Sequence, residues 1–213
     1  MALGPAVRRL FGPYERNIAA AYRAVFIDLG KWTKTIGQWA PEATRILEVG
    51  CGEGSMTEYL CAQFPAAHIT AIDVTSRIGR LFQGNPSRVT FIKAPVEDIA
   101  KEQPGTFDLI VLSDVLHHVR PEFRSSLLAG IRAALAPEGK FAFKEWTRTF
   151  TPIHCMNYVA DRYITGDSVN YLTTSEIIST LEREFGANAI GAQCRISPWK
   201  NNMAVLIVGP NPR

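Results

Sequence analysis

The feature that most constrains this chain is a regular alternation of short apolar runs and amphipathic segments that starts at Arg45. Strands are predicted at five apolar runs: 46–49, 69–72, 89–92, 107–112 and 140–143. Helices are predicted between them at 55–64, from Thr75 or Ser76 to Phe82, and at 121–135. Strands that alternate with helices build βαβ units, so we predict an α/β fold with a mostly parallel sheet and helices on both faces.

The end of the chain departs from this alternation. Thr173 and Glu176 have the spacing of a capping box, which predicts a helix that runs to Phe185. Two apolar segments follow, at about 189–196 and 203–208, and the short polar connection between them predicts an antiparallel hairpin. We therefore expect the parallel sheet to be completed by two antiparallel strands.

Two segments lie outside this framework. Residues 14–37 carry an apolar stripe at spacings of three and four, which predicts one helix within an N-terminal extension, residues 1–44. The stripe is compatible with packing on the main domain, with a lid over a substrate pocket and with a dimer face. Residues 146–172 form a connection longer than the usual two to six or so residues. We predict that they form a cap insertion over the active site of a core domain, residues 45–213.

Composition excludes several classes of protein. Of the 213 residues, 46% are hydrophobic and 20% are charged, as in ordinary globular proteins and unlike disordered or fibrous chains. No apolar run reaches the roughly 20 residues of a membrane span, and charged residues interrupt the apolar stretches near the N-terminus, so we expect neither a membrane segment nor a signal peptide. The four cysteines form no CxxC pair. This predicts reduced thiols, a cytoplasmic location and no metal site.

A glycine-rich loop lies between the first predicted strand and its helix, with the sequence Glu48-Val49-Gly50-Cys51-Gly52-Glu53-Gly54. A dinucleotide site would place the third glycine one residue later and a diphosphate at the helix start, where this chain has the negative charge of Glu53. Glu48 suits a positive group such as an amine or a sulfonium. Asp73 ends the second strand, where an acid accepts hydrogen bonds from ribose hydroxyls. These residues together indicate a nucleoside with an amino-acid tail.

This combination resembles the class I S-adenosylmethionine-dependent methyltransferase superfamily. The resemblance rests on the glycine loop, Asp73, the segment 107–119 and the terminal hairpin, and it covers about residues 45–145. The segment 114–119 is most similar to the small-molecule branch. The resemblance implies a Rossmann-like, seven-stranded, mostly parallel sheet and S-adenosyl-L-methionine as cofactor, with S-adenosyl-L-homocysteine as product. It implies cofactor binding by Glu48, Gly50, Cys51, Gly52, Gly54, Asp73, Val74, Val96, Glu97 and Ser113.

The resemblance also implies how the adenine is held. Val74 would lie against the ring, and Val96 and Glu97 would flank it from the loop after the third strand. Many relatives carry an acid where Pro95 stands, and that acid contacts the adenine amine. Glu97, Asp98 or a backbone carbonyl is expected to take this role here.

Methyl transfer requires a nucleophile aligned with the methyl group and shielded from water, and a general base only for a hydroxyl or a carbon acid. Candidate bases are His117 and His118 after the fourth strand, His154 in the predicted cap, and Glu145 after the fifth strand. A structural role for each is the alternative. Candidate acceptor-binding residues are Lys144, Trp146, Tyr158, Arg162 and Tyr22, and the two basic ones suggest an anionic or hydroxylated acceptor.

Three functions fit these residues. The first is methyl transfer to an oxygen, nitrogen or carbon atom of a small-molecule acceptor. The second is an RNA ribose 2′-O-methyltransferase, since Lys144 and Asp114 resemble half of the Lys-Asp-Lys-Glu set of those enzymes, but residues 203–208 lack its glutamate. The third is a non-catalytic subunit that binds S-adenosylmethionine. A net charge of +3 makes nucleic acid an unexpected partner, and we expect a monomer or a homodimer.

Overall fold

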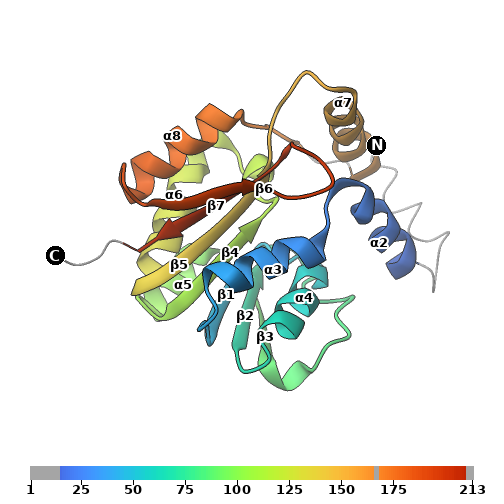
Figure 1. Ribbon diagram of the computed structural model, residues 1–213. Coiled ribbons are helices and arrows are strands. Elements are labelled where there is room, and N and C mark those ends of the chain that lie inside the picture. Colours follow the sequence, from blue (N-terminus) through green and yellow to red (C-terminus); the bar gives the residue numbers. More distant parts are fainter. Residues whose placement is uncertain (1–14, 166–167, 210–213) are drawn as a thin grey trace.

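A computed structural model describes residues 15–165 and 168–209, and its centre is a seven-stranded sheet (Figure 1). The strands are β1 (Arg45–Val49), β2 (His68–Asp73), β3 (Val89–Lys93), β4 (Phe107–Ser113), β5 (Leu135–Trp146), β6 (Ile190–Arg195) and β7 (Asn202–Val208). Their order across the sheet is β3-β2-β1-β4-β5-β7-β6. The first five strands are parallel, and β7 pairs antiparallel with both β5 and β6. This confirms the predicted sheet and its terminal hairpin.

Helices cover both faces of the sheet (Figure 1). On one face lie α3 (Leu29–Trp39) and α4 (Ser55–Gln63), and on the other lie α5 (Val96–Glu102), α6 (Pro121–Ala134) and α8 (Thr174–Phe185). Each layer has its own apolar core, because alternate residues of the central strands point to opposite faces. In β4, Leu109 and Val111 contact the α3–α4 side, while Ile110 and Leu112 contact the other.

The N-terminal extension is not the single helix that its apolar stripe predicts. It forms α2 (Glu15–Phe26) and α3, separated at Ile27 and Asp28. Asp28 caps α3, since its carboxylate accepts a hydrogen bond of 2.9 Å from the backbone N–H of Lys31. A side-chain cap of this kind starts a new helix without interrupting the apolar periodicity, so the pattern alone missed the break.

Two further predictions were wrong in detail. Residues 75–82 form turns rather than a helix, because their backbone bonds to the glycine loop: Gly79 N–H donates to Gly52 O at 2.9 Å and Leu81 N–H to Glu53 O at 2.9 Å. Val96 and Glu97 lie at the start of α5, not in a loop.

The long connection after β5 contains α7 (Pro152–Val159) and a π-helical turn, Ala160–Thr165. Together with α2 it lies beyond the end of the sheet at which β1 and β4 terminate (Figure 1).

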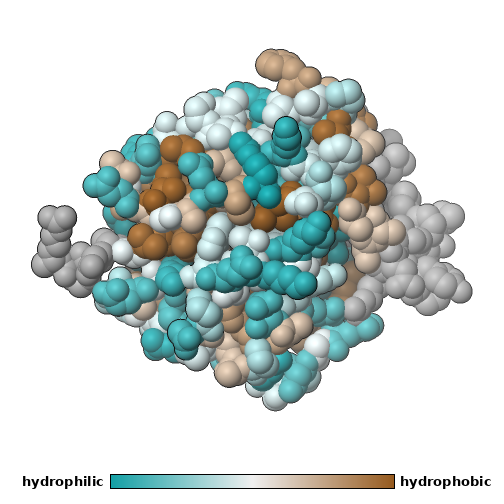
Figure 2. All heavy atoms as spheres, viewed as in Figure 1, coloured by the Kyte–Doolittle hydropathy of each residue, from teal (hydrophilic) through white to brown (hydrophobic). Residues whose placement is uncertain are grey.

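Apolar side chains gather over the β5–β7 part of the visible face, which α4 does not reach (Figure 2). Among the described helices, none combines the length and the apolarity needed to cross a bilayer.

Candidate active site

A cavity of about 290 Å³ lies where β1, β4 and β5 end, beneath α2 and α7. The carboxyl ends of parallel strands are the usual ligand-binding edge of an open α/β sheet. Nine residues predicted for cofactor, catalysis or acceptor line it: Glu48, Gly50, Cys51, Gly52, Ser113, His117, His118, Lys144 and Trp146. The structure therefore brings together predicted residues from three separate parts of the sequence, 48–52, 113–118 and 144–146, in one site.

The glycine loop forms one wall of this cavity. Gly50, Gly52 and Gly54 have φ angles of 77°, 52° and 93°, a region that favours glycine. At Gly50 a Cβ would also lie 2.3 Å from Val115, whereas at Gly52 it would meet nothing within 4 Å. Gly52 therefore presents bare backbone to open space, where a ligand can approach closely.

Asp73 holds this loop in place. Its carboxylate accepts hydrogen bonds of 2.8 Å from the backbone N–H groups of Gly52 and Thr75. The same end of β2 carries Ile72, whose carbonyl accepts from Gly50 N–H at 2.8 Å and Cys51 N–H at 3.0 Å. The predicted ribose-binding acid is thus also the residue that orders the loop, a role that its spacing did not reveal.

Glu48 is buried under the loop, with 3% of its surface exposed. Burial raises the pKa of its carboxyl to about 7, although the hydrogen bond of 2.7 Å from Thr57 Oγ1 opposes this shift. Burial also raises the pKa of the Cys51 thiol, which stays protonated and is no nucleophile. The floor of the loop therefore holds a carboxyl that gains or loses its proton near neutrality.

His117 and Glu145 form a buried pair. Nδ1 of His117 bonds to Oε1 of Glu145, whose other oxygen accepts from the backbone N–H of His117 at 3.2 Å. Burial opposes the charged imidazolium, but the charge and hydrogen bond of Glu145 prevail and raise the pKa of His117. Burial likewise opposes the charge of Glu145, and His117 overcomes it and lowers the pKa of that carboxyl. Because Nδ1 is occupied, Nε2 is the ring nitrogen left to meet a ligand.

Asp114 and Lys144, the two residues that resemble half of the Lys-Asp-Lys-Glu set, form an ion pair, with Nζ 2.6 Å from Oδ2. Lys144 is 1% exposed, and Asp114 adopts a φ of 56°, unusual for a residue other than glycine. Oxygen or nitrogen atoms of Asp114, His117 and Glu145 also lie within 4.8 Å of one another. Strand pairing creates this cluster, which the sequence spacing did not show. The ammonium of Lys144, which pairs with Asp114, already places a positive charge beside this cluster.

The connection after β5 adds two residues that the sequence did not single out, Asn157 and Asp161, both of which line the cavity. Asn157 Nδ2 donates to the hydroxyl of Tyr171 at 2.6 Å, and that hydroxyl donates to Asp161. The Tyr171 ring also stacks on His117, with ring centres 4.5 Å apart. One buried tyrosine thus links the predicted cap to the histidine.

Several predicted site residues lie elsewhere. Val96 is buried in the core, and the Glu97 carboxylate accepts a hydrogen bond of 2.8 Å from Ser126 Oγ. His154 Nδ1 accepts a hydrogen bond of 3.0 Å from Trp146 Nε1, and burial, then the charge of Arg148, lower its pKa.

Of the remaining predicted residues, Gly54 caps α4, and Val74 is 70% exposed beside Asp73. Tyr158 and Arg162 are exposed and do not line the cavity within the described chain. The side chain of Tyr22 lies outside the described residues. The basic residues of the acceptor prediction are therefore either paired, as Lys144 is, or directed elsewhere, as Arg162 is.

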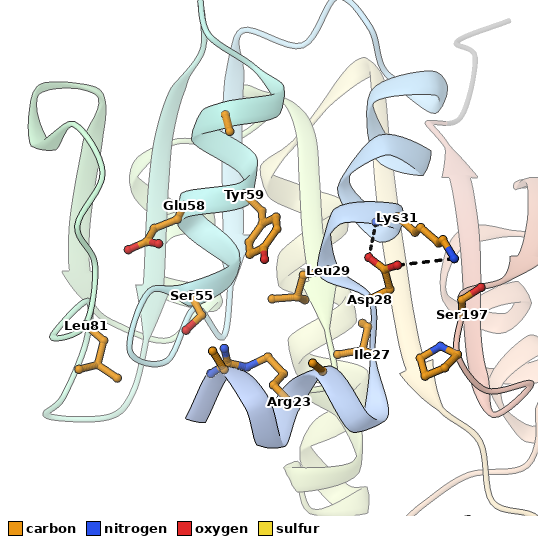
Figure 3. Close-up of a pocket in the computed structure, with 14 residues that line it drawn as sticks. Arg23, Ile27, Asp28, Leu29, Lys31, Ser55, Glu58, Tyr59, Leu81 and Ser197 are labelled. Carbon is orange, nitrogen blue, oxygen red and sulfur yellow. Dashed lines mark hydrogen bonds and ion pairs between the residues drawn. The ribbon is translucent and has the colours of Figure 1, made fainter. Parts of the chain in front are cut away.

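Arg23 of α2 is the clearest residue that sequence reasoning missed. It lines both this cavity and a larger one of about 580 Å³ between α2, α3 and α4 (Figure 3). Burial lowers its pKa, while Tyr59 and Glu53 act in the opposite direction. Within the described residues its guanidinium makes no hydrogen bond or ion pair. A partly buried guanidinium beside the glycine loop is a ready partner for an anionic group.

Comparison with known proteins gives the domain. Residues 47–141 match a family model described as a methyltransferase domain. The malonyl-[acyl-carrier protein] O-methyltransferase of Chlorobium phaeovibrioides is 31% identical over 146 residues, 66% of this chain and 52% of that protein. The ubiquinone biosynthesis O-methyltransferase of Bordetella parapertussis is 38% identical over 104 residues, 46% of this chain and 41% of that protein. The chain thus spans about half or less of the length of these relatives.

Solved structures give the fold. The 1,6-didemethyltoxoflavin-N1-methyltransferase of Burkholderia thailandensis, solved with S-adenosylhomocysteine, superposes with a TM-score of 0.68 at 18% identity, covering 95% of this chain and 87% of that one. The pyocyanin biosynthetic protein PhzM gives a TM-score of 0.69 at 19% identity, covering 96% and 61%. Residues 47–141 therefore match a methyltransferase domain, and the chain has the class I S-adenosylmethionine-dependent methyltransferase fold.

Proposed function

We propose that this protein transfers a methyl group from S-adenosyl-L-methionine to an oxygen, nitrogen or carbon atom of a small-molecule acceptor. The observation that carries the proposal is the glycine loop, tied to β2 by Asp73 and open to the cavity at Gly52. The activities in the names of the two O-methyltransferase relatives support it. So does the S-adenosylhomocysteine bound in a structure of the same fold.

The donor site follows from the charges around the loop. The Asp73 carboxylate has lone pairs left to accept from ribose hydroxyls, and exposed Val74 beside it would contact adenine. Arg23 would pair with the carboxylate of the amino-acid end. Glu48 would favour the positive amino group from beneath. Glu97 bonds to Ser126 and Asp98 pairs with Lys101, so backbone groups near Pro95 would contact the adenine amine.

The acceptor end lies between β4, β5 and the cap. S-adenosylmethionine, when bound, supplies a methyl group on a positive sulfur, which makes its carbon open to in-line attack. Nε2 of His117 would accept the proton of an acceptor hydroxyl, and Glu145 would stabilise the imidazolium that results. Trp146 and Phe26 help to exclude water from this end of the cavity. The α2–α3 extension and the 146–172 insertion would act as its covers.

The RNA alternative gains little from the geometry. The Lys144–Asp114 pair exists, but β7, which lies beside β5, carries no acidic residue. Charge near the cavity is also mixed rather than basic, since Asp114 and Asp161 face it with Lys144 and Arg23.

The free cysteines, among them the exposed Cys155, favour a reducing compartment such as the cytoplasm.

Isothermal titration with S-adenosylhomocysteine tests the donor site. We expect the wild-type protein to bind, and Asp73→Ala to weaken binding roughly ten- to a hundredfold, because charge-assisted hydrogen bonds are lost. Glu102→Ala is the control, since Glu102 is an exposed acid at the end of α5 and lines neither cavity. Equal affinity of the two variants, or no binding by the wild type, would overturn the donor site. Product mass spectrometry with candidate acceptors then separates an enzyme from a non-catalytic subunit.

A further inference from the structure

The junction between α2 and α3 separates two cavities. Arg23, Ile27 and Leu29 line both the inner cavity at the sheet edge and the outer cavity between α2, α3 and α4. In Figure 3, Arg23 points from α2 toward the start of α4, while Asp28 caps α3 and Lys31 lies in its first turn. The position of this junction therefore sets the wall of the proposed donor site.

The connection between β6 and β7, together with the first residue of β7, holds the junction at three points. Nε1 of Trp199 donates to the carbonyl of Val25 at 2.6 Å, and Nδ2 of Asn202 donates to the carbonyl of Phe26 at 2.6 Å. The backbone N–H of Asp28 donates to the carbonyl of Ser197 at 3.0 Å. These bonds join parts of the chain more than 160 residues apart.

The two side chains act where α2 itself offers no partner. The last carbonyls of a helix have no intrahelical donor, and Val25 and Phe26 are the final two residues of α2. Asn202 is completely buried, and its Oδ1 has no partner among the described residues. A buried amide that leaves its oxygen unsatisfied is costly, so its single bond to Phe26 is the evident reason for an asparagine there.

We propose that Trp199 and Asn202 are positioning residues for the donor site. By capping the end of α2, they hold Arg23 and Ile27 against the inner cavity, so that the guanidinium meets the carboxylate of the donor. The inference rests on the proposed function, because it assumes that an S-adenosyl ligand occupies this cavity. It adds a role for the terminal hairpin, which otherwise only completes the sheet.

Titration of the whole chain with S-adenosylhomocysteine tests this role. Trp199→Phe keeps an aromatic ring but removes the Nε1 donor, and Trp199 is 37% exposed, so the fold should persist. We expect about tenfold weaker binding with little change in the thermal midpoint. Trp39→Phe is the matched control, since its indole donates no hydrogen bond among the described residues and lies at the far end of α3.

A double-mutant cycle separates positioning from general damage. If Trp199 acts through Arg23, then Trp199→Phe should cost about twofold or less in an Arg23→Ala background. An equal loss in both backgrounds, or no loss in the wild-type background, would overturn the proposal.

Amide hydrogen exchange without ligand gives a second measurement. We expect Trp199→Phe and Asn202→Ala to speed exchange across α2, and Trp39→Phe to leave it unchanged. If exchange across α2 is unchanged in Trp199→Phe and Asn202→Ala, the proposed positioning role is overturned. If the wild-type protein does not bind S-adenosylhomocysteine, the proposed donor site is wrong. Faster exchange in these variants would then show that the hairpin holds α2 but positions no donor-site residue.

Discussion

At the scale of single residues, the buried pair of His117 and Glu145 is the feature of the candidate site that the sequence pattern revealed least. Both residues were predicted as separate candidate bases, because 28 positions divide them. Pairing of β4 with β5 brings them into contact, and a linear pattern does not contain that distance. The loop glycines and Asp73 were easier to predict, since a local turn and the end of a strand fix their positions. Arg23 was missed because one basic residue in an amphipathic helix has no distinguishing pattern.

The His117–Glu145 pair leads us to predict how the protonation of His117, and with it methyl transfer, depends on pH. We expect NMR titration to place the pKa of His117 above the ordinary 6.5, and Glu145→Gln to lower it, because burial then acts without the opposing carboxylate. A general base must be neutral, so methyl transfer to a hydroxyl should rise with pH through the pKa of His117. In Glu145→Gln this rise should move to lower pH.

Glu102→Gln, an exposed change at the end of α5, serves as the control for that titration. Identical His117 pKa values in the wild type and Glu145→Gln would show that the carboxylate does not set the charge of the ring. Four histidines are present in the chain, so the signal is assigned by its loss in His117→Asn.

At the scale of elements, the sequence predicts a helix start correctly where local capping residues alone determine it. Thr173 and Glu176 form the predicted capping box of α8, with both reciprocal bonds present. The break between α2 and α3 was missed, because the cap at Asp28 leaves the apolar periodicity intact and the β6–β7 hairpin that holds the break comes from a remote part of the chain. The helix predicted at 75–82 failed for the same reason, since the glycine loop takes its backbone hydrogen bonds.

Thr173→Ala should lower the free energy of unfolding by about 1 kcal/mol, because it leaves backbone donors of α8 without their cap. Urea denaturation measures the change. Thr151→Ala is the matched control: Thr151 is the N-cap residue of α7, but its side chain makes no capping bond. Equal losses in the two variants would mean that the capping box contributes no specific stability.

At the scale of the whole molecule, the alternation of strands and helices was enough to predict the layers and the antiparallel finish. The strand order and the residues that meet across the cavity required the structure, because they depend on which strands become neighbours. The cavity is lined by α2, the glycine loop, β4, β5 and α7, so a ligand there touches elements that lie far apart along the chain, from Arg23 to Asp161.

Ligand binding should therefore stabilise the entire fold. S-adenosylhomocysteine at a hundredfold excess over its Kd should add about 2.7 kcal/mol to the free energy of unfolding and raise the Tm. Differential scanning fluorimetry measures the shift. NAD is the contrasting ligand, and we expect no shift with it, because the third loop glycine lies one residue earlier than in a dinucleotide site. A shift with NAD alone would contradict the donor site.

The strand order has a consequence for biosynthesis. In the order β5-β7-β6, the strand formed latest along the described chain lies in the interior of the sheet, between two earlier ones. While a ribosome is still translating residues before Val208, β5 keeps an unpaired edge and β6 has no neighbour to join. A nascent chain of this kind stays exposed to aggregation until almost all of the described residues have left the exit tunnel, and it is a natural client for chaperones.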